Sequence, residues 1–204
     1  MNKLVKENTK NFIVEQATNL FLENSIAGVT MSDIAHHVGI GDATLYRYFK
    51  KKQNIVLLAS TKLAERVYKE CFREEESLTG YEQLSVFYNA YLEIFKKSNS
   101  YYRFIDELDA YLITEKDAEK SEYESEINVF KDVFDRGYDK GLSDGTVLSQ
   151  ADREVFYYAT THSLINLCKF LSTSNALEQD AKIKKEQEIK TMINVILKSL
   201  KADQ

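Results

Sequence analysis

The sequence predicts an all-α protein, in which a three-helix domain at the N-terminus is followed by a helical-bundle domain. Its 204 residues include no proline and seven glycines, a composition that allows long uninterrupted helices. No segment alternates apolar and polar residues for long enough to indicate a strand. A chain of this length can bury a small domain and a second domain with its own core. We expect these domains to cover residues 1–53 and 54–204.

The first expected helix runs from about Thr9 to Glu23 and is amphipathic. The side chains on its apolar face are Phe12, Ile13, Ala17, Leu20 and Phe21. This face could close a three-helix unit over the two shorter helices that follow it.

The second expected helix has a sequence signal at each end. Thr30 and Asp33 have the capping-box spacing, in which each side chain accepts a hydrogen bond from the other residue's backbone N–H. The helix therefore begins near Met31. Gly39 can adopt the left-handed conformation that closes a helix, and a third helix starts almost at once. Residues 30–49 thus have the pattern of a helix-turn-helix motif.

The third expected helix, from about Asp42 to Phe49, has few apolar residues. Leu45 and Phe49 lie four positions apart and form its core face, which leaves the other side chains free to face a DNA groove. Thr44 can contact a base or a phosphate, and tyrosine hydroxyls commonly donate to phosphates. The lysines at 50–52 then follow as candidate phosphate contacts.

Together these motifs resemble the N-terminal domain of the TetR family of transcriptional regulators. The matching segments are ATNLFLENSIAGVTM around the end of the first helix, IAHHVGI at the turn, TLYRYF in the recognition helix and KKKQNIVLLA at the start of a long connecting helix. They cover about the first quarter of the chain. The resemblance implies DNA contacts at Met31, Ser32, Asp42, Ala43, Thr44, Tyr46, Arg47, Tyr48 and Lys52. Among these, Tyr46 and Lys52 are expected at phosphates.

Two residues depart from the family pattern. Gly41 stands where a capping side chain is common, and Asp42 places a negative charge near the phosphates. Asp42 could accept a hydrogen bond from a cytosine amino group, but an acid that complements the helix macrodipole is the simpler interpretation. Tyr46 and Tyr48 could pack against the first helix, although their offset from the apolar face favours exposure.

Charge is distributed unequally along the chain. Residues 1–60 carry seven Lys and Arg against five acids, a balance of +2, and the remainder carries 20 against 27, or −7. The basic part therefore coincides with the helix-turn-helix motif. No 18-residue apolar run or secretory signal is visible, so we expect a cytoplasmic protein with no membrane partner. Cys71 and Cys168 form no C-x-x-C pair and are expected to be reduced thiols.

Beyond residue 53 the pattern predicts further helices. The first, from about Asn54 to Phe72, links the two domains. The others are expected over about Tyr81 to Lys97, Tyr101 to Thr114, Ala118 to Lys140, Gln150 to Thr173 and Lys184 to Lys201. The breaks between them are expected at Gly80, at residues 98–100 and at the GLSDG segment from Gly141.

The last two helices are the expected dimer interface. Their apolar side chains recur at helical spacing and are Leu164, Leu167, Leu171, Ile189, Met192, Ile193, Ile196 and Leu200. Two such hairpins related by a two-fold axis would form a four-helix bundle, which is also how the resembling family dimerises. The alternative is burial of this stripe within one subunit, and a second exposed stripe on the same hairpin would be required to decide.

Aromatic residues are concentrated in the middle helices, where most should belong to the core. A bundle walled by Tyr and Phe can also enclose a small-molecule site, and the resemblance implies such an inducer pocket. Its candidate residues are Tyr68, Phe72, Tyr88, Tyr91, Tyr102, Phe104, Phe134, Tyr158, His162 and Asn166. His162 could instead be a hydrogen-bonded core residue. Glu107 and Asp109 could pair with a cationic ligand, but their position beside the apolar faces favours solvated surface.

Catalysis is not expected from this sequence. No Glu-x-x-His pair, phosphate-cradling glycine loop or nucleophile elbow occurs, and three histidines supply too few ligands for metal catalysis. We therefore expect neither a cofactor nor a metal. The sequence predicts a ligand-responsive homodimeric repressor that binds a palindromic operator in double-stranded DNA and a small-molecule effector. The alternative is a dimeric helical adaptor for protein interactions, whose DNA binding is weak or lost through Gly41 and Asp42.

Overall fold

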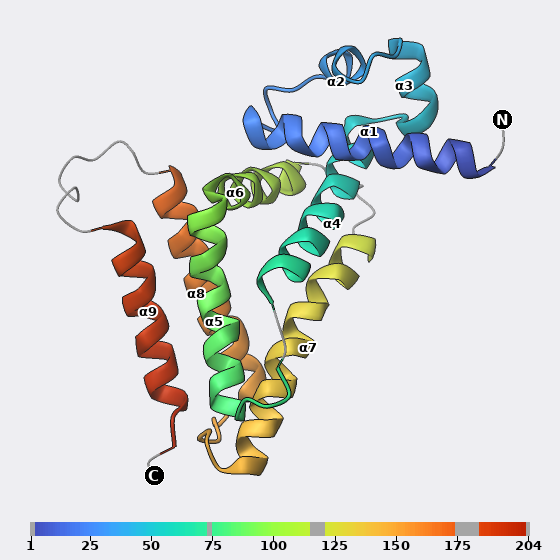
Figure 1. Cartoon of the computed structure of the whole chain (residues 1–204). Coiled ribbons are helices and arrows are strands. Elements are labelled where there is room, and N and C mark those ends of the chain that lie inside the picture. Colours follow the sequence, from blue (N-terminus) through green and yellow to red (C-terminus); the bar gives the residue numbers. More distant parts are fainter. Residues whose placement is uncertain (1–2, 73–74, 115–120, 174–183, 203–204) are drawn as a thin grey trace. The chain divides into compact units, whose positions relative to one another are not determined.

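The computed structural model describes residues 3–72, 75–114, 121–173 and 184–202, and every named element in these ranges is an α-helix (Figure 1). The all-α prediction is confirmed. In chain order the helices are α1 (Lys3–Glu23), α2 (Met31–His37), α3 (Asp42–Phe49), α4 (Lys52–Cys71), α5 (Gly80–Lys97), α6 (Asn99–Thr114), α7 (Ser121–Asp144), α8 (Arg153–Thr173) and α9 (Lys185–Leu200).

The chain packs into two compact units. Residues up to Arg66 form the first unit together with the segment from Arg103 to Glu126. The second unit contains Val67 to Tyr102 and the residues from Ile127 onward. This division follows packing within the chain, whereas the functional boundary expected at residue 53 stays a prediction.

Short-range hydrogen bonds place α2 as predicted. The Asp33 N–H donates to the Thr30 hydroxyl at 3.1 Å, and the Thr30 N–H donates to the Asp33 carboxylate at 2.8 Å. The Thr30 hydroxyl also donates to this carboxylate, and the hydroxyl and N–H together hold the pKa of Asp33 below its ordinary value. Gly39 has a φ of +72°, so the predicted left-handed closure of α2 is confirmed.

The core of the first unit is small and is shared by its helices. Its fully buried side chains include Ile13, Ala17, Ile34, Ala35, Leu45 and Ile55. Helix α1 begins at Lys3, earlier than the expected start at Thr9, and its inward face is narrower than predicted. Phe12 is 52% exposed because it lies about 100° around the helix from the buried Ile13, on the solvent side.

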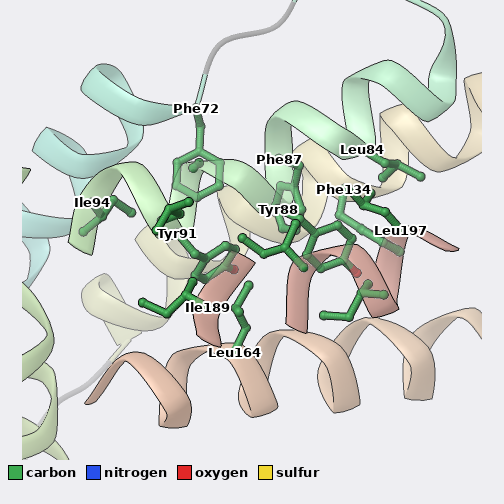
Figure 2. Packing of buried hydrophobic residues seen from close by; sticks show 14 of the residues in the cluster. Phe72, Leu84, Phe87, Tyr88, Tyr91, Ile94, Phe134, Leu164, Ile189 and Leu197 are labelled. Carbon is green, nitrogen blue, oxygen red and sulfur yellow. The ribbon is translucent and has the colours of Figure 1, made fainter. Parts of the chain in front are cut away.

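The core of the second unit is rich in aromatic rings from α5, α7 and α8. Figure 2 shows Phe87, Tyr88 and Tyr91 of α5 beside Phe134 of α7, with Ile189 of α9 closing the cluster. The ring centroids of Phe87 in α5 and Phe134 in α7 are 5.8 Å apart at 60°, close to the edge-to-face geometry that aromatic pairs favour. Long-range packing of this kind therefore holds the second unit together.

Two glycines bring α5 and α7 into backbone contact. A Cβ atom added to Gly80 would lie 2.0 Å from the backbone nitrogen of Gly141. Gly141 still lies within α7, and the break expected in the GLSDG segment falls at its end, where Gly145 has a φ of +74°. Gly141 serves close packing, whereas Gly145 supplies the left-handed turn. The start expected for this helix at Ala118 lies outside the described residues.

Candidate nucleic-acid interface

Helix α3 is anchored by one face and presents the other to solvent. Leu45 and Phe49 are buried, as expected for the core face. Around them Asp42, Ala43, Tyr46 and Arg47 are exposed, and Tyr46 keeps 51% of its surface accessible. Thr44 and Tyr48 are half-buried. The helix therefore offers a polar face with hydroxyl and guanidinium donors, which are the groups that contact phosphates and base edges.

The start of α3 is held without a capping side chain. Gly41 is the N-cap residue and has no side-chain hydrogen bond to make. Asp42 lies in the first turn, where a negative charge complements the helix macrodipole, and its carboxylate accepts from the Ser32 hydroxyl at 3.4 Å. Ser32 is exposed on α2. This contact links the first turns of the two helices of the motif.

Three lysines follow α3, and they have different surroundings. Lys50 has a φ of +56°, and its N–H donates to the Tyr46 carbonyl at 2.9 Å as the chain turns out of the helix. Lys50 and Lys51 are exposed. Lys52 begins α4 and is half-buried, with its ammonium donating to the carbonyl of Ile26. Burial lowers the pKa of Lys52, and the nearby Asp33 and Glu107 carboxylates oppose that shift.

Met31 is a second predicted DNA contact that, like Lys52, is not freely exposed. Met31 is 8% exposed and packs in the core of the first unit, so its DNA contact stays a prediction. Sequence reasoning also missed the surroundings of Lys52, which include Ile26, Glu107 and Tyr111. No local signal could have found them, because Glu107 lies 81 residues from Ile26 in the sequence.

Glu107 is not the solvated surface residue that the pattern favoured. Its side chain is half-buried, and the carboxylate accepts a hydrogen bond from the Ile26 N–H at 2.5 Å. The sequence pattern placed Glu107 beside an apolar face of its helix, but it could not show that the carboxylate accepts from a backbone N–H in another segment.

The residues expected to line an effector pocket do not lie together. Tyr68, Phe72, Tyr88, Tyr91, Tyr102 and Phe134 belong to the aromatic core of the second unit or pack against it. Phe104, by contrast, lies in the first unit. Tyr158, His162 and Asn166 are exposed on α8, so for these three the prediction of an inward face is wrong. Their positions follow from α8 burying the opposite side, which carries Leu164 and Cys168.

The hydroxyl groups of the aromatic core are largely satisfied within it. The Tyr88 hydroxyl lies 2.8 Å from the Thr160 hydroxyl, and the Tyr102 hydroxyl donates to the Tyr91 carbonyl at 2.8 Å. Burial raises the pKa of Tyr88, Tyr91 and Tyr102 above the ordinary tyrosine value. Burial also raises the pKa of the free Cys168 thiol to about 12.

The side chains expected at a dimer interface instead fill the protomer's own core. Those that are buried within the second unit are Leu164, Leu171, Ile189, Ile193, Ile196 and Leu200. Leu167 and Met192 are partly buried against the same cluster. For the buried six the structure shows the alternative, burial within one subunit, because α8 and α9 pack against each other and against α5.

A second apolar stripe lies on the outer faces of the same two helices. Its large exposed members are Val155 (61% exposed), Tyr158 (41%) and Phe170 (53%) on α8, and Val195 (61%) on α9. The α8 members are separated by three and twelve residues, so they lie on one side of the helix with His162 and Asn166 between them. The dimer hypothesis requires a second exposed stripe on these two helices, and a dimer interface here stays a prediction.

Residues 13–59 match the family described as "Bacterial regulatory proteins, tetR family". That range includes the whole of α2 and α3. It therefore contains both the buried Leu45 and Phe49 and the exposed polar face of α3. This N-terminal part of the chain thus matches the TetR family. An HTH-type transcriptional regulator of Staphylococcus aureus (strain USA300) is 44% identical over 55 residues, which are 27% of this chain and 29% of that protein. The chain thus matches less than a third of the length of its curated relatives.

Solved structures of other transcriptional regulators match the fold over nearly the whole chain. The ketosteroid transcriptional regulator KstR2 of Mycobacterium tuberculosis is 16% identical, with a TM-score of 0.61 and 96% of each chain covered. The TetR family transcriptional regulator PfmR from Thermus thermophilus is 17% identical, with a TM-score of 0.56, and covers 91% of this chain and 97% of its own. At these identities the likeness establishes the fold alone, which is the helical fold of these regulators.

Neither a membrane-spanning helix nor a metal-holding cluster occurs in the described part of the chain. None of its helices combines the length and the apolar character that crossing a membrane requires. Within the same ranges, no group of three or more His, Cys, Asp or Glu side chains is placed to hold a metal ion.

Proposed function

We propose that this protein is a TetR-family transcriptional regulator that binds specific double-stranded DNA through α2 and α3. The observation that carries the proposal is the polar outer face of α3, held in place by the buried Leu45 and Phe49. A helix anchored in this way can enter a major groove with its side chains toward the base edges.

The exposed side chains of the motif suggest a division of roles. Tyr46 and the lysines at 50 and 51 are exposed, and in this proposal they contact phosphates, which position a protein on DNA without reading sequence. Thr44 and Arg47 are the candidates for base contacts, and Ala43 lets the helix tip approach closely. A phosphate contact by Lys52 requires its ammonium to leave the Ile26 carbonyl.

The protein acts as a homodimer in this proposal. One helix-turn-helix motif reads only a half-site, and two related by a two-fold axis read a palindrome. The stripe of Val155, Tyr158, Phe170 and Val195 supports dimerisation, because it is apolar and exposed on the two helices that end the chain. Facing stripes from two copies would form a four-helix bundle.

The same proposal makes the protein a repressor that responds to a small molecule. The support for this role is the aromatic and apolar composition of the second unit's core, since small-molecule sites are lined mostly by such side chains. An effector would lower operator affinity by binding more tightly to a conformation in which the recognition helices are wrongly spaced. An effector that left operator affinity unchanged would contradict this role.

Fluorescence anisotropy tests the proposal. The full chain is titrated onto DNA from upstream of its own gene and onto a scrambled duplex, each at several salt concentrations. We expect much tighter binding to one palindromic site, two protomers per site and a steep fall in affinity with salt. Equal, weak binding to both duplexes and to every fragment of a genomic selection would favour the adaptor instead.

A further inference from the structure

The peptide group of Ile26 is bound at both ends by charged side chains. Its N–H donates to the Glu107 carboxylate at 2.5 Å, and its carbonyl accepts from the Lys52 ammonium. Ile26 itself is 1% exposed, so these bonds are made in a region from which water is largely excluded. Hydrogen bonds to charged groups are about twice as strong as neutral ones, and more so where water is absent.

Ile26 and Lys52 lie on either side of the helix-turn-helix motif. Ile26 lies in the loop between α1 and α2, four residues before the α2 cap at Thr30. Lys52 is the first residue of α4, just after the recognition helix α3 ends at Phe49. The bond between Lys52 and Ile26 therefore joins the chain that leads into the motif to the chain that leaves it.

Helix α6 supplies the third member of this network. From Arg103 onward α6 belongs to the same compact unit as the motif. Glu107 and Tyr111 lie one turn apart on α6, and both approach Lys52. The Lys52 ammonium is 5.9 Å from the centre of the Tyr111 ring and is attracted by the Glu107 charge.

We infer that Glu107 is a positioning residue for DNA reading, which fixes the helix-turn-helix motif by holding Ile26 and Lys52 in one charged network. The inference rests on the proposed function and names a residue on which DNA reading by α2 and α3 depends. Without the Glu107 carboxylate, the Ile26 N–H loses its acceptor and the Lys52 ammonium loses a neighbouring negative charge. In this inference the Lys52 ammonium stays bonded to the Ile26 carbonyl when DNA binds, so Lys52 is not a phosphate contact.

Three variants of the full chain test the inference: Glu107→Ala, Lys52→Met and the double variant. Glu15→Ala is the charge-matched control, because Glu15 is an exposed acid on α1 in the same unit. Lys51→Met is the control for an exposed lysine next to Lys52. Amide hydrogen exchange at Ile26 and across residues 24–38 is measured for each protein, and operator affinity is measured by anisotropy against salt.

We expect Glu107→Ala to raise amide exchange at Ile26 about tenfold and to spread faster exchange into α2. Glu107→Gln keeps an acceptor for the Ile26 N–H but removes the charge that attracts Lys52, so its exchange should be intermediate. On the operator, Glu107→Ala and Lys52→Met should each weaken binding about fivefold, and the double variant should be no weaker than the poorer single variant. Lys52→Met should keep the wild-type salt slope, whereas Lys51→Met should lower it by about one.

An unchanged amide exchange rate at Ile26 in Glu107→Ala would overturn the inference. So would a double variant whose loss of operator affinity is the product of the two single losses, together with a lowered salt slope in Lys52→Met. If no duplex is bound specifically by the wild-type chain, the proposed function fails. The exchange data alone then decide whether Glu107 fixes the motif. Glu15→Ala should match the wild type in every measurement.

Discussion

The two compact units differ in the range over which their decisive contacts are made. In the first unit, α2 is started by a hydrogen-bonded pair only three residues apart, Thr30 and Asp33, and most side chains of α3 remain exposed. In the second unit, rings from α5, α7 and α8 pack together across long stretches of chain, as Phe87, Phe134 and Tyr157 do. The first unit thus presents a surface built on local signals, whereas the second depends on a shared core.

The largest effect is expected where two backbones touch in the second unit. Gly80→Ala places a Cβ atom 2.0 Å from the Gly141 nitrogen, and neither backbone can move without parting α5 from α7. We expect a loss of about 3 kcal/mol in the free energy of unfolding, measured by urea denaturation. Gly41→Ala in the first unit is the control, because nothing lies within 4 Å of its added Cβ atom. It should cost less than about 1 kcal/mol. Similar losses of unfolding free energy in Gly80→Ala and Gly41→Ala would contradict the difference drawn between the two units.

The next effect concerns the outer stripe of the second unit. Phe170→Asp places a charge on an exposed apolar position that we assign to the dimer interface, so the dimer dissociation constant should rise about tenfold or more. Analytical ultracentrifugation measures this constant, and circular dichroism should show unchanged helix content. Phe12→Asp is the matched control, because Phe12 is equally exposed on α1 of the first unit. Equal weakening by both substitutions would remove the stripe from the interface.

Smaller effects are expected on the face of α3, where they should alter binding more than stability. Tyr46→Phe removes an exposed hydroxyl and should weaken binding to all duplexes alike, by about 1 kcal/mol or fivefold. Thr44→Ala should change the preference among operator variants. Anisotropy with a panel of single-base operator variants separates the two results. A uniform loss across the panel for Thr44→Ala would deny Thr44 a base-reading role.

The smallest effect is expected in the pH dependence of the free energy of unfolding, to which one carboxylate in each unit contributes. Hydroxyl and N–H donors lower the pKa of Asp33 in the first unit and of Asp144 in the second below the ordinary 3.8. A lowered pKa in the folded state means that the unfolded chain binds the proton more tightly. Their stabilisation is therefore present above the unfolded pKa and is lost as pH falls through the folded one. Asp33→Asn and Asp144→Asn should each make the free energy of unfolding, measured by urea denaturation, depend less steeply on pH between pH 4 and pH 2. An unchanged pH dependence would contradict the lowered pKa of the replaced carboxylate.

Local signals in the sequence predicted the motif well because the forces involved act within a few residues. The pair of Thr30 and Asp33 fixed the start of α2, and Gly39 its left-handed end, as the structure has them. The four-residue spacing of Leu45 and Phe49 predicted the face that anchors α3. Backbone hydrogen bonds and dihedral preferences depend on neighbours along the chain, so the residues themselves carry this information.

Only the tertiary structure decided what each helix face meets. The stripe containing Leu164 and Ile193 was correctly recognised as apolar, but it packs inside its own protomer, while Tyr158 of the expected pocket faces outward. Lys52 carried the pattern of a phosphate contact, yet its ammonium is bonded to the Ile26 carbonyl beside the distant Glu107. Periodicity determines that a helix has an apolar face, whereas the partner that covers it is set by contacts between segments far apart in the chain. The sequence by itself therefore determined the helices and the motif, and the packed fold determined which of their side chains remain available for binding.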